Sequence, residues 1–449
     1  MTTACHIVRA SYDPAELRRA VAGFLPDGDY RRICIKPNWV LHQEHDAFPI
    51  QALITSPLLI EAVIESCLVK YPSLQWIIVG DVPLQSCEWE KMAAQCGLDR
   101  LIRKYADRQN PTVRFLDLRR ERFVKVQGYL EPDLAFRDGD PQGYREIVLD
   151  AASYLDPISD RKARFRVSDY DPGITTSSHR EGFHRYVIAG SALEADLFIN
   201  LPKMKTHQKA GITGALKNLV GINGQKACLV HHRKGSPSSG GDEFGPNAPF
   251  LVRTQVRVRE LLQKRSRFLF AIGRKVWLVL KRLRGIHTEA TRERLREGRI
   301  YMAAGSWYGN DTIWRMVYDL NRIIKYATAR GGELSTKPQR SYLAIVDAIV
   351  SGEGNGPLQP LPVDTGVLIA GTDPLLVDSV MATLMGYDIV KIPCLAHHRE
   401  FRDSDWGQFN PADVVIGLND GLVRGLAGLP VLHAFIPPPG WRGHIEKAT

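Results

Sequence analysis

Strand and helix patterns alternate near the N-terminus, and this alternation restricts the fold more than any other feature of the sequence. Short apolar runs at Cys5–Arg9, Arg32–Lys36 and Trp76–Val79 predict strands. Helical patterns at residues 14–24 and 57–69 separate these runs, and the second pattern has Ser as its N-cap and Pro as its first residue. Strands that alternate with crossover helices form parallel sheets, so we expect an α/β fold.

The same order returns in the second half of the chain. Residues 341–349 and 367–370 predict strands, and a helix capped by Asp373 follows as far as Met385. For 449 residues we therefore expect two lobes built on mainly parallel sheets with crossover helices, plus a basic amphipathic helical insertion. The expected boundaries are 1–170 for the N-terminal lobe and 171–449 for the C-terminal lobe, with the insertion at about 225–305.

The stretch Asp196–Gly224 is the strongest candidate for a functional site. An apolar strand at Leu197–Asn200 leads into a predicted polar loop, and a glycine-rich turn then starts a helix at Ala215. The loop carries four basic or titratable side chains: Lys203, Lys205, His207 and Lys209. Lysines and the amides at a helix N-terminus both favour negative charge, so the sequence predicts an anion site, although solvated loop charges give the same pattern. His207 and Lys205 are the candidate catalytic residues, with His207 as the acid or base.

Further substrate-binding candidates follow from strand ends and helical spacing. Lys36 and Asn38 come at the end of a predicted strand, at the sheet edge where ligands bind in α/β folds. Thr213 and Lys217 are four residues apart and would share one face of a helix, with Asn218 beside them. Lys203 is a further candidate for substrate binding. The alternative for Lys217 is an ordinary surface lysine.

Three carboxylates are candidate ligands of a divalent cation. Asp81 and Asp347 lie near predicted strand ends, and Glu353 lies in a glycine-rich loop. In that loop, Gly354 and Asn355 are candidates for substrate binding because glycine allows a ligand to approach the backbone closely. The alternative is an ordinary turn with a polar side chain. His231 and His232 are adjacent, a spacing that favours structural histidines over a metal site.

One segment accounts for the net charge of +10. Residues 252–284 hold 11 of the 59 Lys and Arg residues and 1 of the 49 acidic residues, which leaves 48 of each sign elsewhere. Within this segment, residues 267–283 predict a basic amphipathic helix, a pattern shared by helices that lie on anionic membranes and by surface helices that pack on a core. Nucleic acid is not expected as a partner, because no reading module accompanies the charge.

Cysteine spacing and apolar runs bear on cofactors and location. The seven cysteines include no CxxC pair, so neither an iron–sulfur cluster nor a cysteine-built metal site is expected. No signal peptide or spanning segment is evident, which predicts a cytoplasmic protein, peripheral at the inner face of the membrane if residues 267–283 bind lipid.

The order of several motifs resembles the DUF362 family (domain of unknown function 362). The resemblance runs from about Lys36 to Ile392 and rests on KPNWV, ITSPLLIEAV, VGD, DLFINLPKMKTH, GALKNLVGING, GEGNGP and AGTDPLLVDSVMATLMG. It implies an α/β fold with a shared pocket and no established reaction. Some relatives carry a ferredoxin-like, cysteine-rich module, which this chain lacks. The stretch GNDTIWRMVYDLNRI resembles a subgroup linked to cell-envelope polysaccharide formation.

Two functions from different classes fit these observations. The first is an enzyme acting on an anionic substrate, phosphorylated or carboxylated and in one version lipid-linked, in a pocket between the lobes. The second is a non-catalytic, membrane-associated binding or assembly protein that works in cell-envelope polysaccharide formation. A redox role is a third option, made less attractive by the absence of a cysteine cluster.

Overall fold

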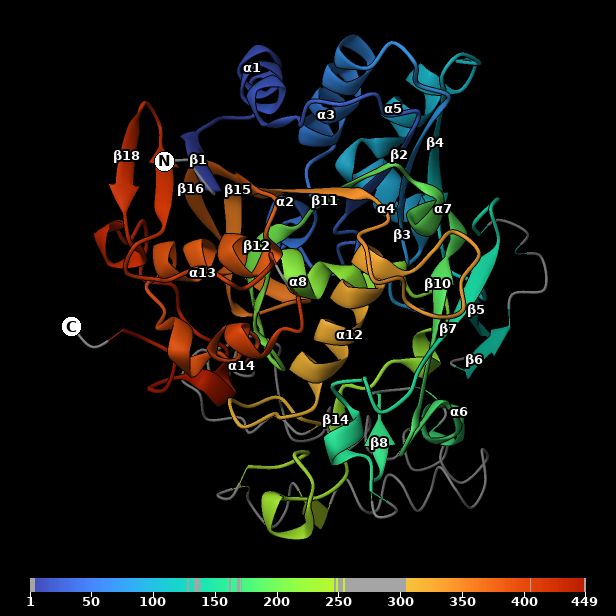
Figure 1. Ribbon diagram of the computed structural model, residues 1–449, viewed down its shortest axis with the longest axis vertical. Coiled ribbons are helices and arrows are strands. Elements are labelled where there is room, and N and C mark those ends of the chain that lie inside the picture. Colours follow the sequence, from blue (N-terminus) through green and yellow to red (C-terminus); the bar gives the residue numbers. More distant parts are fainter. Residues whose placement is uncertain are drawn as a thin grey trace.

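The fold is mixed α/β and is built on one large, mainly parallel sheet (Figure 1). A computed structural model describes residues 5–126, 129–132, 136, 139–160, 163–167, 170, 172–245, 248, 253–254, 304–403 and 405–447. Within these residues the large sheet has eleven strands, of which nine follow the order β18-β17-β1-β16-β15-β11-β2-β3-β4, while β12 pairs with β15 and β13. Pairs β17·β1, β15·β11, β15·β12, β11·β2, β2·β3 and β3·β4 are parallel.

The strands of the large sheet come from both halves of the chain. In chain order they are β1 (Cys5–Arg9), β2 (Arg32–Pro37), β3 (Trp76–Asp81), β4 (Thr112–Asp117), β11 (Leu197–Leu201), β12 (Lys203–His207), β13 (Gly211–Thr213), β15 (Ser341–Asn355), β16 (Gln359–Gly371), β17 (Val415–Leu418) and β18 (Gly421–Arg424). Strand β11 lies between β2 and β15, so the sheet joins segments from both predicted lobes. The lobe boundary near residue 170 stays a prediction.

Three small sheets complete the strands. They consist of β7 (Tyr144–Leu149), β10 (Phe183–Ala189) and β9 (His179–Arg180); of β8 (Phe165–Arg166) and β14 (His232–Arg233); and of β5 (Phe123–Val126) and β6 (Tyr129–Pro132).

Helices cover both faces of the large sheet. Figure 1 shows α1 (Pro14–Phe24), α3 (Pro57–Lys70) and α5 (Leu98–Tyr105) together on one side, and α12 (Ile313–Tyr326), α13 (Pro374–Leu384) and α14 (Pro393–Ala396) on the other. The remaining described α-helices are α2 (Ile50–Leu53), α4 (Trp89–Cys96), α6 (Pro172–Ser178), α7 (Gly190–Glu194) and α8 (Ala215–Asn218). The predicted caps of α3 and α13 are confirmed. Ser56 Oγ accepts from the Leu58 amide, and Asp373 accepts from the Leu375 amide.

Each face of the sheet has its own hydrophobic core. In β2, Ile33 and Ile35 belong to one core and Cys34 to the other, because successive side chains of a strand point to opposite faces. In β11, Leu197 and Ile199 alternate with Phe198 in the same way. Continuous apolar strands of this kind are expected where a parallel sheet is buried on both sides.

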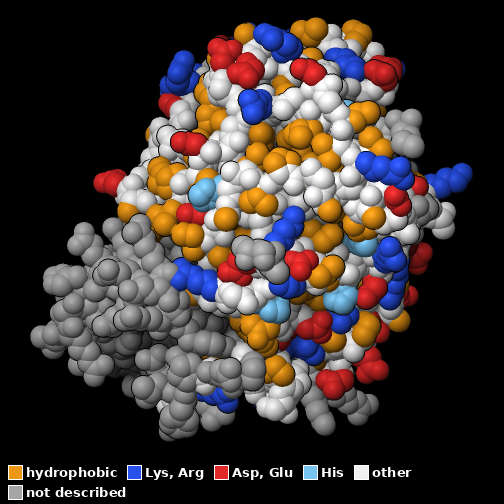
Figure 2. Space-filling model, turned by 90° about the vertical axis from the view of Figure 1, so that its left-hand side faces the viewer, with side chains coloured by type: hydrophobic (Ala, Val, Ile, Leu, Met, Phe, Trp, Pro, Cys, Tyr) orange, Lys and Arg blue, Asp and Glu red, His pale blue; other side chains and the backbone are white. Residues whose placement is uncertain are grey.

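The described surface carries charges of both signs. On the face shown in Figure 2, Lys and Arg side chains lie interspersed with Asp and Glu side chains and with apolar ones. The amphipathic helix predicted at residues 267–283 lies outside the described residues, so it stays a prediction. Among the helices that the structure describes, none combines the length and the apolar character needed to span a bilayer.

Candidate functional site

A buried ion pair lies at the carboxyl ends of two neighbouring parallel strands. Lys36, near the end of β2, places Nζ 2.9 Å from Oδ1 of Asp81, the last residue of β3. The second carboxylate oxygen, Oδ2, accepts from the Trp39 amide at 2.6 Å. Both charged side chains are almost completely buried, at 1% and 3% exposure. Lys36, a predicted substrate-binding residue, and Asp81, a predicted cation ligand, therefore form an ion pair with each other.

Asn218 connects this pair to the adjacent strand β11. Its Oδ1 accepts from Asn38 Nδ2 at 2.9 Å and from Lys36 Nζ at 3.3 Å. Its Nδ2 donates to Asn200 Oδ1 at 2.7 Å, and Asn200 in turn donates to the carbonyl of Ala215. Hydrogen bonds between buried amides hold a site rigid, and here Asn38 Oδ1 is left without a hydrogen-bond partner among the described residues. The structure thus brings together three predicted residues, Lys36, Asn38 and Asn218.

The segment that follows β11 is a buried strand, and the prediction of a polar loop there is wrong. All five residues of β12 are buried, because β12 pairs in parallel with β15. Lys203 lies opposite Asp347 in this pairing, and its Nζ is 3.0 Å from Oδ2. Tyr12 OH donates to Oδ1 of the same carboxylate and accepts from Lys203. These partners come from distant parts of the chain and allow the charges to be buried.

Lys205 has a different environment from Lys203. It is 0% exposed, and its Nζ donates to the backbone carbonyl of Leu53. Burial, together with the nearby ammonium of Lys203, holds the pKa of Lys205 well below its ordinary value. Thr213 lies opposite Lys205 in the β12·β13 pairing, and its buried Oγ1 has no hydrogen-bond partner among the described residues. Thr213 is therefore a strand residue and not, as predicted, part of a helical face.

The start of helix α8 is occupied by a carboxylate of the protein itself. Asp378, within α13, accepts from the amides of Ala215 at 2.6 Å and Leu216 at 3.0 Å. Gly214 allows this approach, since a Cβ there would lie 2.1 Å from Asp378 Oδ1. Burial raises the pKa of Asp378 to about 7. The expectation that these amides bind an external anion is wrong, because their acceptor is already present.

Lys217 and Lys226 bring two more cations to the same region. Lys217 lies on α8 with 9% exposure, and Lys226 has 7% exposure and donates to the carbonyl of Val220 at 3.4 Å. Burial and the charge of Lys226 lower the pKa of Lys217 to about 7. Burial also lowers the pKa of Lys226 to about 8, although Asp81 opposes this shift.

We define the lysine cluster as Lys36, Lys203, Lys205, Lys217 and Lys226. Its members are close enough for mutual repulsion: Lys203, Lys217 and Lys36 all lower the pKa of Lys205. Among the described residues, two carboxylates form ion pairs with the cluster, Asp81 with Lys36 and Asp347 with Lys203. Lys205, Lys217 and Lys226 have no carboxylate of their own in this part of the chain. A buried set of cations in excess over carboxylates favours an anion.

His207 borders the cluster as a neutral group. Its Nδ1 accepts from the amides of Lys209 at 3.0 Å and Ala210 at 3.2 Å, which places the ring proton on Nε2. Burial and the charges of Lys217 and Lys209 hold the pKa of His207 well below its ordinary value. Both observations favour a hydrogen-bond donor at Nε2, and the role of His207 as acid or base stays a prediction.

The chain passes very close to the Lys36–Asp81 pair at Gly221. A Cβ at this position would lie 1.9 Å from Asp81 Oδ1 and 2.4 Å from Lys36 Cε. The Gly221 carbonyl also accepts from the Val82 amide at 2.9 Å. Only a residue without a side chain can pack here, which explains on steric grounds why GALKNLVGING has a glycine at position 221.

The predicted cation ligands are not brought together. Asp81 and Asp347 pair with different lysines, while Glu353 accepts from the Ile436 amide at 2.8 Å and lies 3.3 Å from His433 Nε2. Gly354 binds the carbonyl of Ile436 through its amide, and its carbonyl accepts from Thr206. Within the described ranges no group of three or more His, Cys, Asp or Glu side chains is placed to hold a metal ion.

Asn355 also has partners outside the lysine cluster. It accepts from Gln208 Nε2, and its own Nδ2 donates to Gln359 Oε1 at 3.0 Å. Both partners lie near the β15–β16 hairpin. Strand β15 continues as far as Asn355, so the residues of the predicted glycine-rich loop belong to the end of this strand. The structure therefore assigns Gly354 and Asn355 to the hairpin end and not to the cluster.

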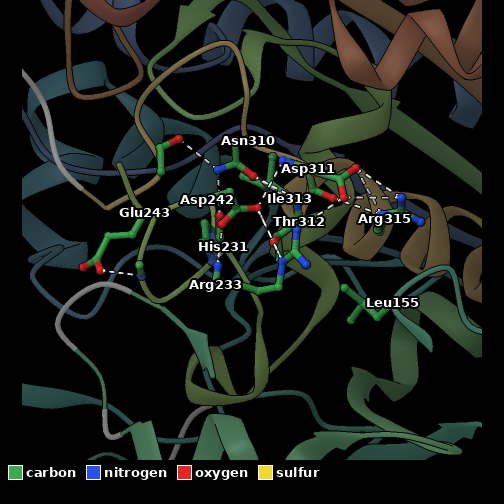
Figure 3. A network of polar contacts seen from close by, with 12 residues as sticks. Leu155, His231, Arg233, Asp242, Glu243, Asn310, Asp311, Thr312, Ile313 and Arg315 are labelled. Carbon is green, nitrogen blue, oxygen red and sulfur yellow. Dashed lines mark hydrogen bonds and ion pairs between the residues drawn. The ribbon is translucent and has the colours of Figure 1, made fainter. Parts of the chain in front are cut away.

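A second polar network fixes the segment after His231 to the start of α12 (Figure 3). Asp242 is 1% exposed and accepts from the Arg233 amide and from Thr312 Oγ1, each at 2.5 Å. Asn310 donates to the carbonyl of His231 at 2.9 Å, and its Oδ1 accepts from the Ile313 amide at 3.0 Å. Asn310 thus binds the amides at the start of α12, where Thr312 precedes the first helical residue. These contacts hold the chain at Arg233 and Asp242 against the start of α12.

Sequence reasoning missed three residues of the site: Asn200, Lys226 and Asp378. Asn200 had a signal, because it is the single polar residue in the apolar run LFINL. Asp378 lies inside the predicted helix that follows Asp373, and its contact with α8 depends on tertiary structure. Lys226 has no local signal, since its neighbours along the chain read as an irregular segment.

Comparisons with known proteins agree with the motif resemblance. The family model described as Domain of unknown function (DUF362) matches residues 142–383. The solved structures that match include two of low identity. One is the crystal structure of a protein from Thermotoga maritima, with 10% identity, 78% of this chain and 53% of that chain covered, and a TM-score of 0.33. The other is the lactate racemase apoprotein from Thermoanaerobacterium thermosaccharolyticum, with 11% identity, coverage of 83% and 54%, and a TM-score of 0.32.

The chain therefore spans about half the length of these two solved chains. No curated protein matches the sequence significantly.

Proposed function

The chain belongs to the DUF362 family, and we propose that it is an enzyme acting on an anionic substrate, phosphorylated or carboxylated, held over the lysine cluster. One observation carries this proposal. Lys205, Lys217 and Lys226 are at least nine-tenths buried, yet the described residues supply none of them with a carboxylate. Burial lowers the pKa of each, which means that the free protein opposes their charging. A bound anion would reverse this cost.

The exposure of the basic side chains at this site increases from the interior outwards. Lys36, Lys203 and Lys205 are at most 1% exposed, whereas Lys217, Lys226 and His207 retain 7–9%. An anion would therefore first meet Lys217, Lys226 and the Nε2 donor of His207. Lys36 and Asp81 would lie behind them, with Asn218 fixing their orientation. Ammonium groups that are fixed in position attract phosphate or carboxylate as point charges.

Anion binding can be tested by thermal unfolding of the full-length protein. Phosphate, diphosphate and small carboxylates are added at millimolar concentration, and the shift in Tm is measured for wild type and two variants. Lys205→Met removes a buried charge without a carboxylate partner, so this variant is expected to fold but to lose most of the shift. Lys91→Met changes an exposed lysine and is expected to keep it. Equal shifts in both variants, or none in wild type, would contradict the proposal.

The second function predicted from the sequence was a membrane-associated binding or assembly protein. It depends on residues 267–283, which lie outside the described part of the chain, so it stays a prediction. The same holds for a lipid-linked form of the substrate.

A further inference from the structure

Lys217 lies at the outer side of the lysine cluster, on a helix that hydrogen bonds hold in place. It lies on α8, whose first amides are held by Asp378 at 2.6 and 3.0 Å. The next residue, Asn218, is fixed by bonds to Asn38 and Asn200. The backbone that presents Lys217 is thus fixed on both sides of the residue, which is the kind of positioning that reacting groups require.

Among the described residues, the amine of Lys217 differs from those of the other cluster lysines in having no hydrogen bond or ion pair. Lys36 and Lys203 are paired with carboxylates, Lys205 donates to the Leu53 carbonyl and Lys226 donates to the Val220 carbonyl. For Lys217 the described residues provide no hydrogen bond or ion pair, although the side chain is nine-tenths buried. The described residues thus leave the amine of Lys217 available to contact a ligand.

The surroundings of this amine favour its neutral form. Burial is the main cause, and the charges of Lys226, Lys209 and Lys36 add to it, which together bring the pKa to about 7. An ordinary lysine has a pKa near 10.4, so at neutral pH the neutral fraction of Lys217 is larger by roughly a thousandfold. A neutral amine is a nucleophile, and desolvation beside other cations is a known way to activate one.

We propose that Lys217 is the reactive amine of this site, and that the substrate is an anion carrying an aldehyde or ketone carbonyl. This inference rests on the proposed function, since the other lysines of the cluster would hold the carboxylate or phosphate group. The Nζ lone pair of Lys217 attacks the carbonyl carbon, and a carbinolamine forms as the carbonyl oxygen takes up a proton. Loss of that oxygen with both amine hydrogens, as one water, gives an imine.

Reductive trapping tests the reactive amine. Full-length protein is incubated with glyoxylate and sodium cyanoborohydride at pH 7, and adducts are located by peptide mass spectrometry. We expect the carboxymethyl adduct on Lys217 to form at least about tenfold faster than on exposed Lys91, because of the difference in neutral fraction. Lys217→Arg should lose the fast adduct, and Lys91→Arg should keep it. Labelling of Lys217 no faster than Lys91 overturns the inference.

Two further arms test the substrate class. Acetaldehyde carries the carbonyl without a charge, and glycolaldehyde phosphate carries it with a phosphate in place of a carboxylate. Trapping by either charged aldehyde should exceed trapping by acetaldehyde, and their ratio distinguishes phosphate from carboxylate. Equal trapping by all three overturns the substrate class. If anions still raise Tm in wild type but not in Lys205→Met while trapping fails, the proposed function stands and the inference about Lys217 does not.

Discussion

Asp378 and Ala215 are 163 residues apart in sequence, yet the carboxylate of one accepts from the amide of the other at 2.6 Å. The bond joins α13 to the short helix that carries Lys217 and Asn218. A carboxylate in this position acts as the N-cap of a helix to which it does not belong. The geometry of the lysine cluster consequently depends on the packing of two helices and not only on the local sequence around Lys217.

The first prediction concerns this cap. The pKa of Asp378 is raised to about 7, so the folded state binds more protons than the unfolded state between about pH 4 and 7. Stability due to this group is therefore present at low pH and is lost as the pH rises towards 7. Asp378→Asn stays neutral at both pH values and, like the protonated carboxyl group of wild type at pH 5, accepts strongly at only one atom. We therefore expect it to lie within about 1 kcal/mol of wild type at pH 5 and to be more stable relative to wild type at pH 8.

Urea unfolding at the two pH values measures this difference. Asp378→Ala serves as the control, because it loses both accepted bonds. A difference between Asp378→Asn and wild type that is the same at pH 5 and pH 8 would show that the carboxyl group does not titrate as described.

The second prediction concerns the pH dependence caused by Lys217 and Lys226. Their pKa values are lowered to about 7 and about 8, so above these values the unfolded state binds more protons than the folded state. Stability should therefore rise with pH from about 7 towards 10, by up to about 1.4 kcal/mol per pH unit for each lysine. Lys217→Met should reduce this slope by about half in urea unfolding, whereas Lys91→Met should leave it unchanged.

The third prediction concerns the Lys36–Asp81 ion pair. Lys36→Met leaves a buried carboxylate without its partner at 2.9 Å and should cost about 3 kcal/mol in the free energy of unfolding. The double variant Lys36→Met/Asp81→Asn keeps an acceptor for the Trp39 amide and should lose less than Lys36→Met alone. Additive losses in the double-mutant cycle would mean that the two side chains are not coupled.

The fourth prediction concerns Gly221. In Gly221→Ala the new methyl group would overlap Asp81 Oδ1 and Lys36 Cε, so the variant should lose about 1–3 kcal/mol and bind anions more weakly. Gly23→Ala is the matched control: no atom lies within 4 Å of a Cβ there, and the residue is in helix α1. That substitution should stabilise the protein by about 0.4–1 kcal/mol. Thermal and urea unfolding of both variants, with and without phosphate, provide the measurement.

Local patterns predicted the elements well but not the way they are buried. The strands at Cys5–Arg9 and Arg32–Pro37 and the helix α1 follow from apolar runs and caps, which act over a few residues. A loop was predicted in place of β12 because the segment contains Lys203 and Lys205, and charged side chains are rarely buried. Asp347, which pairs with Lys203, lies 144 positions later in the sequence and could not be assigned to it from spacing.

The candidate site was found in part for the same reason. Lys36, Asn38 and Asn218 were predicted because strand ends and motif loops have sequence signals, and the structure places them in contact. The role of Glu353 as a cation ligand and the place of Asn355 in the substrate site depended on which strand ends face each other. Because β15 continues to residue 355, Glu353 and Asn355 lie in a strand and not in the predicted loop.

The network around Asp242 has one more consequence. The amide of Gly305 donates to the carbonyl of Glu243 at 3.0 Å, so two positions 62 residues apart in the sequence lie side by side. Spectroscopic labels at Glu243 and Gly305 would therefore stay a short distance apart while the segment after His231 remains attached to the start of α12. An increase in their separation on heating would report the opening of this contact separately from the unfolding of the large sheet.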